Sequence, residues 1–185
     1  MRAQQHFIAR EGTVTGILGA VLVALWYFVF DVTAGVPFRT PNVLGKILFR
    51  GNITFRGDIT PGLRNIVPEM VAGYAVVHLI LFVLAGMGLT FLIHLSARNP
   101  AWRMGVWIGM VVTFAMFAGM TFMLTTATGE RLPLWTVVGG TLVGVVGMAA
   151  YLWRRHPRFQ QTFHEAPLGS EQPAPSHPPE GTTVK

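Results

Sequence analysis

The sequence predicts an all-α integral membrane protein with four transmembrane helices and a short amphipathic surface helix in the first extramembrane loop. Three observations lead to this prediction. Only 12% of the 185 residues are charged, whereas soluble domains carry about a quarter. The mean hydropathy is +0.49. Four apolar stretches are near or above the roughly 20 residues that a helix needs to cross the hydrocarbon core.

The predicted spans are residues 13–32, 70–95, 104–124 and 132–153. Residues 1–12 form the N-terminus, 33–69 a long outer loop, 96–103 a short basic inner loop and 125–131 a second outer loop. Residues 154–185 begin basic and continue as a tail rich in Pro, Gly and Ser, a composition typical of disorder. The first span is expected to be retained, because Trp26-Tyr27-Phe28 occupies the place where a signal peptide has small cleavage-site residues.

Basic residues near the helix ends predict the orientation. The arginines close to the helix ends on one side of the membrane are Arg2, Arg10, Arg98, Arg103, Arg154, Arg155 and Arg158. Such residues stay in the cytoplasm, so both termini are predicted to be cytoplasmic in a bacterial inner membrane, although the long outer loop is also basic. The net charge of +6 suits anionic lipid headgroups, and bound lipids are expected. The sequence shows no basic surface with interleaved aromatic residues, so nucleic-acid binding is not expected.

A surface helix is predicted near the start of the long outer loop. Thr40-Pro41 has the form of an N-cap followed by a first-turn proline. The pattern then places Val43, Leu44, Ile47 and Leu48 on one helix face, opposite Asn42, Lys46 and Arg50. This alternation predicts an amphipathic helix lying on the membrane surface.

The stretch RGNITFRGDITPG, residues 50–62, follows this helix and nearly repeats itself. Its Arg-Gly-Asp triplet and its Asn-Ile-Thr sequon are both short enough to arise by chance. In an extended chain Ile53, Phe55 and Ile59 would share one side, because strand side chains alternate. We hypothesise a short strand or hairpin that docks this apolar side against a partner or the bundle. A flexible solvated loop is the competing interpretation.

Small residues recur at helical spacing inside the predicted spans. The pairs Gly12 and Gly16, Gly105 and Gly109, and Gly140 and Gly144 each form a GxxxG pattern. Small residues allow close contact between helix backbones in lipid. Gly140 and Gly144 are therefore predicted to be interaction residues, either within the bundle or against the helices of another protein. The sequence leaves both uses open.

Chemistry-bearing residues are sparse in the predicted spans. No carboxylate lies at mid-membrane, no catalytic motif is present and the chain contains no cysteine, so an enzyme is not expected. His78 is the candidate cofactor ligand, and Met116 and Met120 on the next span lie at about the same depth. His/Met ligation suits haem or copper, and a lone histidine can hold a chlorin. The preferred expectation is that no cofactor or metal is bound and that these residues serve packing.

The function predicted from these features is a non-catalytic accessory or structural subunit of a larger bacterial membrane complex, for example in respiratory or photosynthetic electron transport. Its expected partners are other integral membrane subunits and membrane lipids. The first alternative is a small b-type cytochrome or pigment-binding membrane protein that uses His78. The second alternative is a component of a transporter or channel, which the scarcity of buried polar residues disfavours.

Overall fold

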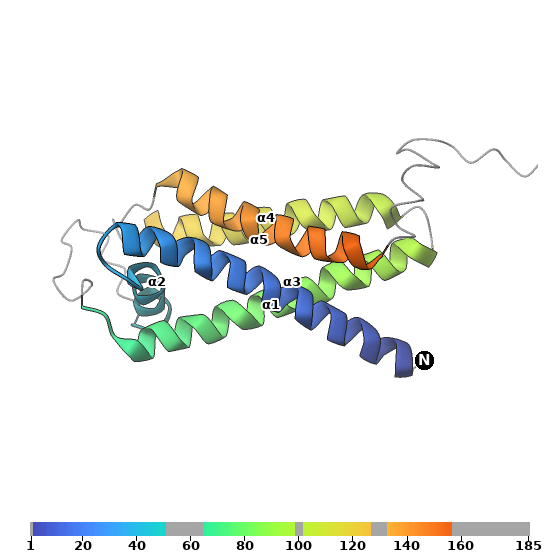
Figure 1. Ribbon diagram of the computed structural model, residues 1–185, viewed down its shortest axis with the longest axis horizontal. Coiled ribbons are helices and arrows are strands. Elements are labelled where there is room, and N and C mark those ends of the chain that lie inside the picture. The colour runs from blue at the N-terminus through green and yellow to red at the C-terminus, as the bar shows by residue number, and fades with distance from the viewer. Residues whose placement is uncertain (1, 51–64, 99–101, 127–132, 157–185) are drawn as a thin grey trace, which may run out of the picture.

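The computed structural model describes residues 2–50, 65–98, 102–126 and 133–156, and no strand occurs within these ranges. The helices are α1 (Arg2–Thr33), α2 (Arg39–Arg50), α3 (Pro68–Arg98), α4 (Arg103–Thr126) and α5 (Leu134–Arg155) (Figure 1). Each helix except α2 contains a stretch of 20 to 30 residues that is long enough and apolar enough to cross a membrane. The prediction of an all-α chain with four such helices is confirmed. The predicted strand or hairpin at Ile53, Phe55 and Ile59 lies outside the described residues.

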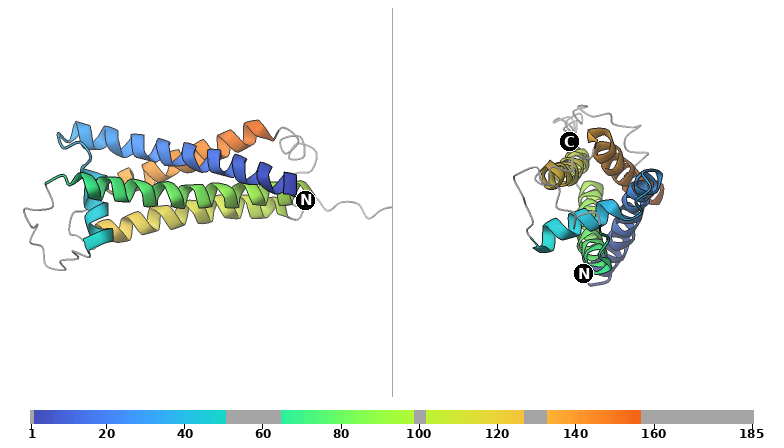
Figure 2. Two further views of the ribbon diagram at one scale, coloured as in Figure 1. Left: turned by 90° about the horizontal axis from the view of Figure 1, so that it is seen from below. Right: turned by 90° about the vertical axis from the view of Figure 1, so that its left-hand side faces the viewer.

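The four long helices form a bundle in which neighbours in sequence are not always neighbours in space. α1 packs against α3 and α5, and α4 packs against the same two helices from the other side. Figure 2 shows this arrangement along the bundle and from one end. The start of α1 and the end of α5 lie at the same end of the bundle (Figure 1). Residues from the two ends of the described chain can therefore meet.

Glycines allow α1 and α3 to cross in direct backbone contact (Figure 1). A Cβ atom added to Gly86 of α3 would collide with the backbones of Gly12 and Gly16 on α1. A Cβ atom added to Gly16 would in turn meet the backbone of Phe82 and Val83. Only residues without a side chain permit such an approach, and close packing is a main source of helix association in lipid.

Apolar side chains from all four long helices fill the interior of the bundle. The Phe82 and Phe117 rings stack across α3 and α4, with centroids 4.2 Å apart and planes 14° from parallel. Met148 of α5 is fully buried in the same cluster. Offset or stacked aromatic pairs add to the dispersion energy of a packed core. The core thus joins all four long helices around one apolar centre.

The short helix α2 lies across one end of the bundle, nearly perpendicular to the long helices (Figure 2). It is attached to α1 by the buried carboxylate of Asp31. The Thr40 backbone N–H donates to Asp31 Oδ2 at 2.8 Å, and the Thr40 hydroxyl donates to Asp31 Oδ1 at 2.7 Å. The first N–H groups of a helix have no partner within the helix, so this carboxylate satisfies one of them. Asp31, rather than the predicted Thr40, supplies the capping side chain.

The polar residues of α2 are not where the sequence pattern placed them. Val43, Leu44 and Ile47 are buried as expected and contact Tyr74. Asn42 and Lys46, predicted for the opposite face, are also buried, with exposures of 1% and 3%.

The segment before α3 explains this difference. The Asn42 side chain donates to the carbonyl oxygen of Asn65 at 3.1 Å and accepts from the Val67 N–H at 2.9 Å. The Lys46 ammonium donates to the same Asn65 carbonyl. Leu48, predicted for the apolar face, is instead 45% exposed. The polar side chains of Asn42 and Lys46 are therefore buried against the segment before α3, which supplies the hydrogen-bond partners that buried polar groups require.

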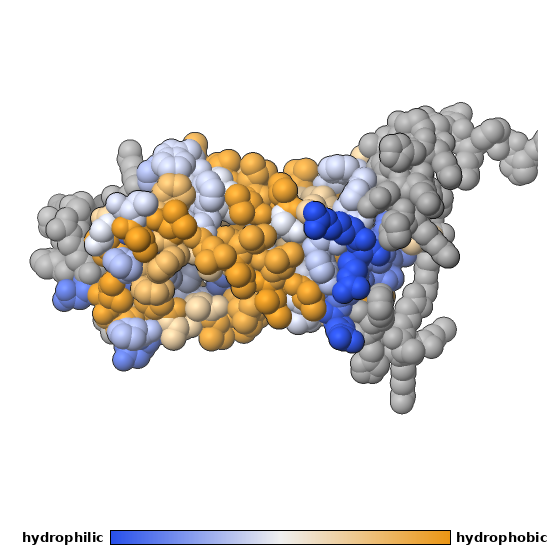
Figure 3. Space-filling model, in the orientation of Figure 1, coloured by the Kyte–Doolittle hydropathy of each residue, from blue (hydrophilic) through white to orange (hydrophobic). Residues whose placement is uncertain are grey.

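The surface of the bundle is divided into an apolar middle and polar ends. Figure 3 shows hydrophobic residues covering the middle of the visible face and strongly hydrophilic residues gathered at the end where α1 begins. Arg10, Arg154 and Arg155 are exposed. In water such an apolar surface would be unfavourable, whereas a bilayer covers it.

Candidate functional site

The predicted cofactor ligand His78 lies on α3 and is half-buried against α1. Its Nε2 atom is 3.3 Å from the carbonyl oxygen of Ala20, within hydrogen-bond distance. Its ring centroid is 5.6 Å from that of Tyr74 and 4.6 Å from that of Phe82. Ligation of a metal through Nε2 would require the contact with Ala20 to break. In this structure the imidazole has a partner on α1.

The two predicted methionines occupy different surroundings. Met120 and His78 line the same cavity of about 150 Å³, to which all five helices contribute residues. Met116 is not among the residues that line this cavity, and 49% of it is exposed on the outside of α4. The structure therefore brings His78 near one of the two methionines.

His78 also lines a larger cavity of about 310 Å³ between α1, α3 and the start of α2. Most of its lining is apolar, and the residues with polar groups are Tyr27, Asp31, Thr40, Tyr74 and His78. Among the described residues the buried Tyr27 hydroxyl has no hydrogen-bond partner. Small-molecule sites commonly combine an apolar wall with a few converging polar groups, and this cavity has that form.

The predicted interaction glycines of α5 pack against α1 of the same chain. A Cβ atom on Gly140 would lie 2.8 Å from the Trp26 ring, and one on Gly144 would lie 2.5 Å from Val23. The indole N–H of Trp26 also donates to the carbonyl oxygen of Thr136 at 3.0 Å. Of the two uses that the sequence left open, the structure places these glycines in contacts within the bundle.

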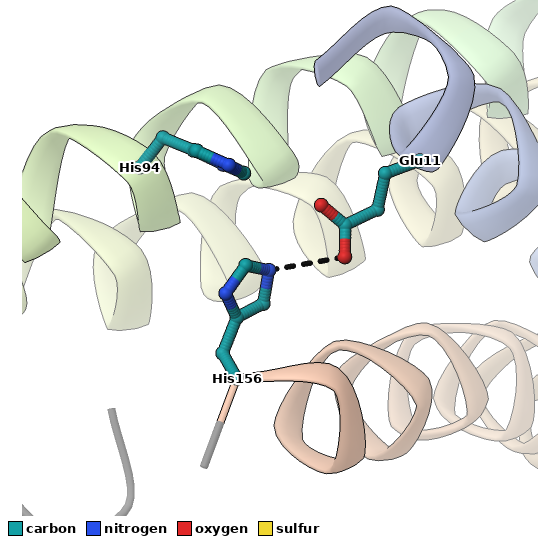
Figure 4. Close-up of side chains that lie close together, drawn as sticks. All are labelled: Glu11, His94 and His156. Carbon is teal, nitrogen blue, oxygen red and sulfur yellow. Dashed lines mark hydrogen bonds and ion pairs between the residues drawn. The ribbon is translucent and has the colours of Figure 1, made fainter. Parts of the chain in front are cut away.

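A second group of polar residues meets at the end of the bundle where α1 begins. Figure 4 shows Glu11 from α1, His94 from α3 and His156 at the end of α5 facing one another. His156 Nε2 is 3.0 Å from Glu11 Oε1. The two imidazole rings have centroids 5.2 Å apart and are nearly perpendicular. One ligand atom from each of the three residues lies within 4.8 Å of the others.

The surroundings of this Glu–His–His cluster set the orientation of its side chains. His94 Nδ1 lies 3.0 Å from the carbonyl oxygen of Thr90, one turn earlier on α3. His156 is the C-cap residue of α5, and its backbone N–H donates to the Leu152 carbonyl oxygen at 3.1 Å. Glu11 is 7% exposed, and its Oε2 atom has no hydrogen-bond partner among the described residues. An unpaired carboxylate oxygen in such a place is energetically costly.

Sequence reasoning did not identify this cluster. Glu11 falls in the segment assigned to the N-terminus, but α1 begins at Arg2 and places Glu11 inside a helix. His156 falls in the basic segment after the last span, and His94 lies at the end of the second predicted span, where no site was expected. One signal was present, because all three residues lie near the inner ends of their predicted spans. Their meeting depends on α1 packing between α3 and α5, which spacing does not reveal.

The apolar helices and their bundle define this chain as a multi-pass, all-α membrane protein with four transmembrane-type helices. Comparisons with protein-family models, with curated proteins and with solved structures each gave no match. The function is therefore argued from the residues of this chain.

Proposed function

We propose that this chain is a non-catalytic accessory subunit of a larger bacterial membrane complex, in which α4 contacts another integral membrane subunit. A respiratory or photosynthetic electron-transport complex is the assembly class that we favour. The proposal is supported by the outward face of α4, which the other described residues leave largely uncovered.

The exposure of α4 distinguishes it from the other long helices. Only 17% of its most apolar stretch is buried inside the chain, against 28% to 39% for α1, α3 and α5. Its exposed large side chains are Met104, Trp107, Ile108, Val111, Val112, Met116, Met120, Phe122 and Met123. Methionine adapts its shape to irregular partner surfaces, and aromatic residues are common in interfaces. This composition suits contact with another helical surface.

Photo-crosslinking in native membranes tests this proposal. We expect a crosslinker at Val111, which is 64% exposed on α4, to form adducts with a protein that also co-purifies at a fixed ratio in mild detergent. The matched control is Val146, which is 55% exposed on α5, the most buried of the four helices. It should yield lipid adducts. If Val111, like Val146, yields lipid adducts and no protein adduct, α4 faces the bilayer and the subunit proposal fails.

A cofactor-binding membrane protein is the second candidate function, and the 310 Å³ cavity beside His78 favours it. The unpartnered Tyr27 hydroxyl would give a pigment or haem edge a polar contact there. The absorption spectrum of the isolated protein, separated from its partner subunits, distinguishes the two candidates. A Soret or chlorin band that disappears in His78→Ala would favour the cytochrome or pigment-binding function. A colourless isolated protein would favour the accessory subunit.

The proposed orientation has both termini in the cytoplasm and α2 in the headgroup region of the outer leaflet. Exposed arginines at the end where α1 begins agree with cytoplasmic retention of positive charge. The exposed apolar side chains of Phe38, Leu48 and Phe49 suit the headgroup boundary around α2.

Cysteine labelling in intact cells checks this orientation, since the chain has no native cysteine. Pro37→Cys, at an exposed position between α1 and α2, should react with a membrane-impermeant reagent. Ser176→Cys should react only after the membrane is opened. Labelling of Ser176→Cys alone from outside would reverse the proposed orientation.

A further inference from the structure

The Glu–His–His cluster combines three potential metal ligands from three helices that are far apart in sequence. Glu11, His94 and His156 come from α1, α3 and the end of α5, and they face one another at one end of the bundle (Figure 4). The accessory-subunit proposal assigns this cluster no role. It is also separate from the cavity beside His78, whose lining includes none of the three residues.

An ion pair between Glu11 and His156 does not account for the whole cluster. That contact uses Oε1 of the carboxylate and leaves Oε2 without a hydrogen-bond partner among the described residues. Protein interiors rarely leave a buried carboxylate oxygen unsatisfied, because the lost hydration is not replaced. A cation held between the carboxylate and the two imidazoles would satisfy this oxygen.

We infer that Glu11, His94 and His156 bind one divalent first-row transition metal ion, for which Zn²⁺ is the simplest fit. Two imidazole nitrogens and one carboxylate oxygen are an established ligand set for zinc, with a fourth position left to water. Calcium and magnesium prefer oxygen ligands throughout, so this ligand set disfavours them.

The distances are compatible with such a site after small side-chain movements. Two ligands about 2.0–2.2 Å from a tetrahedral zinc ion lie roughly 3.4 Å apart. The separation of His156 Nε2 and Glu11 Oε1 is 3.0 Å, and all three ligand atoms already lie within 4.8 Å of one another. A modest rotation of the side chains around the ion would complete the tetrahedral separations.

The environment of His94 supports its assignment as a ligand. Its Nδ1 atom is 3.0 Å from the Thr90 carbonyl oxygen. Metal-binding histidines characteristically donate one ring N–H to a carbonyl or carboxylate, which fixes the tautomer and presents the other nitrogen to the metal. With Nδ1–H donating to Thr90, Nε2 is the ligand atom. The metal then connects α1, α3 and α5 and holds their ends together.

Metal binding to the tag-free, full-length protein in detergent tests this inference. After incubation with Zn²⁺ and removal of loosely bound ions, we expect about one equivalent per chain by elemental analysis, and an increased Tm. Co²⁺ in place of Zn²⁺ should give the visible absorption bands of a four-coordinate site. Glu11→Gln and His156→Ala should weaken binding by more than about 100-fold, since changes to outer-shell partners alone cost 10- to 100-fold.

Two control variants separate this site from other ligands in the chain. Glu69→Gln removes an exposed carboxylate at the opposite end of α3, and His78→Ala removes the histidine of the apolar cavity. Both should keep the stoichiometry and the affinity. The inference is overturned if the unchanged protein binds no Zn²⁺, if Co²⁺ gives no four-coordinate spectrum, or if folded Glu11→Gln binds as tightly as the unchanged protein. Because the Co²⁺ spectrum uses the unchanged protein, a misfolded variant does not prevent the test.

Discussion

Gly86→Leu is expected to force α1 and α3 apart and to lower the free energy of unfolding by about 3 kcal/mol or more. Overpacking in proteins costs about 1–3 kcal/mol, and more where nothing can move aside. At Gly86 the added side chain meets the backbones of Gly12 and Gly16, not the end of a flexible side chain. Thermal unfolding in detergent, followed by circular dichroism, measures the loss.

Gly88→Leu is the matched control, because it places the same side chain on the same helix. A Cβ atom at Gly88 meets nothing within 4 Å. Leucine also favours helix more than glycine does, so this variant should keep or slightly raise stability. Equal losses in Gly86→Leu and Gly88→Leu would show that helix composition, and not the backbone contact between α1 and α3, determines the effect.

Asp31→Ala is expected to release the start of α2 and to lower the free energy of unfolding by about 2–3 kcal/mol. Hydrogen bonds to charged groups contribute about 1.5–3 kcal/mol. The Asp31 carboxylate accepts from both the N–H and the hydroxyl of Thr40, and it is 4% exposed. Unfolding in detergent measures the stability, and hydrogen exchange should show faster exchange in α2.

Thr33→Ala provides the comparison for Asp31→Ala. Thr33 is also a polar residue at the end of α1, but it is exposed and donates only to the Phe30 carbonyl of its own helix. Its replacement should cost less than about 0.5 kcal/mol, as is usual for surface substitutions. If Asp31→Ala costs no more than Thr33→Ala, the carboxylate does not hold α2 in place.

The arrangement of α2 shows where sequence patterns stop being informative. The pattern of residues 39–50 correctly predicts a helix and correctly groups Val43, Leu44 and Ile47. It did not predict that Asn42 and Lys46 would be buried. Helical periodicity shows which residues share a face, but it does not show what covers that face. Here the segment before α3 supplies a carbonyl oxygen and an N–H to the polar side.

The glycines of the long helices illustrate the same division. Their spacing indicates that two helix backbones approach closely, and it leaves the identity of the second helix open. The structure pairs Gly12 and Gly16 with Gly86, and it pairs Gly140 and Gly144 with side chains of α1. The pairing follows from the order of helices around the bundle, which is a property of the whole chain.

The sequence alone is sufficient to predict the helical class and the four helices that are long and apolar enough to span a membrane, because an apolar run of about 20 residues has few other stable environments. Only the tertiary structure shows which residues of different helices are neighbours. Glu11, His94 and His156 carry no recognisable spacing along the chain, yet they meet because α1 packs between α3 and α5. A ligand set drawn from three helices is a relation across space, and local sequence patterns do not encode it.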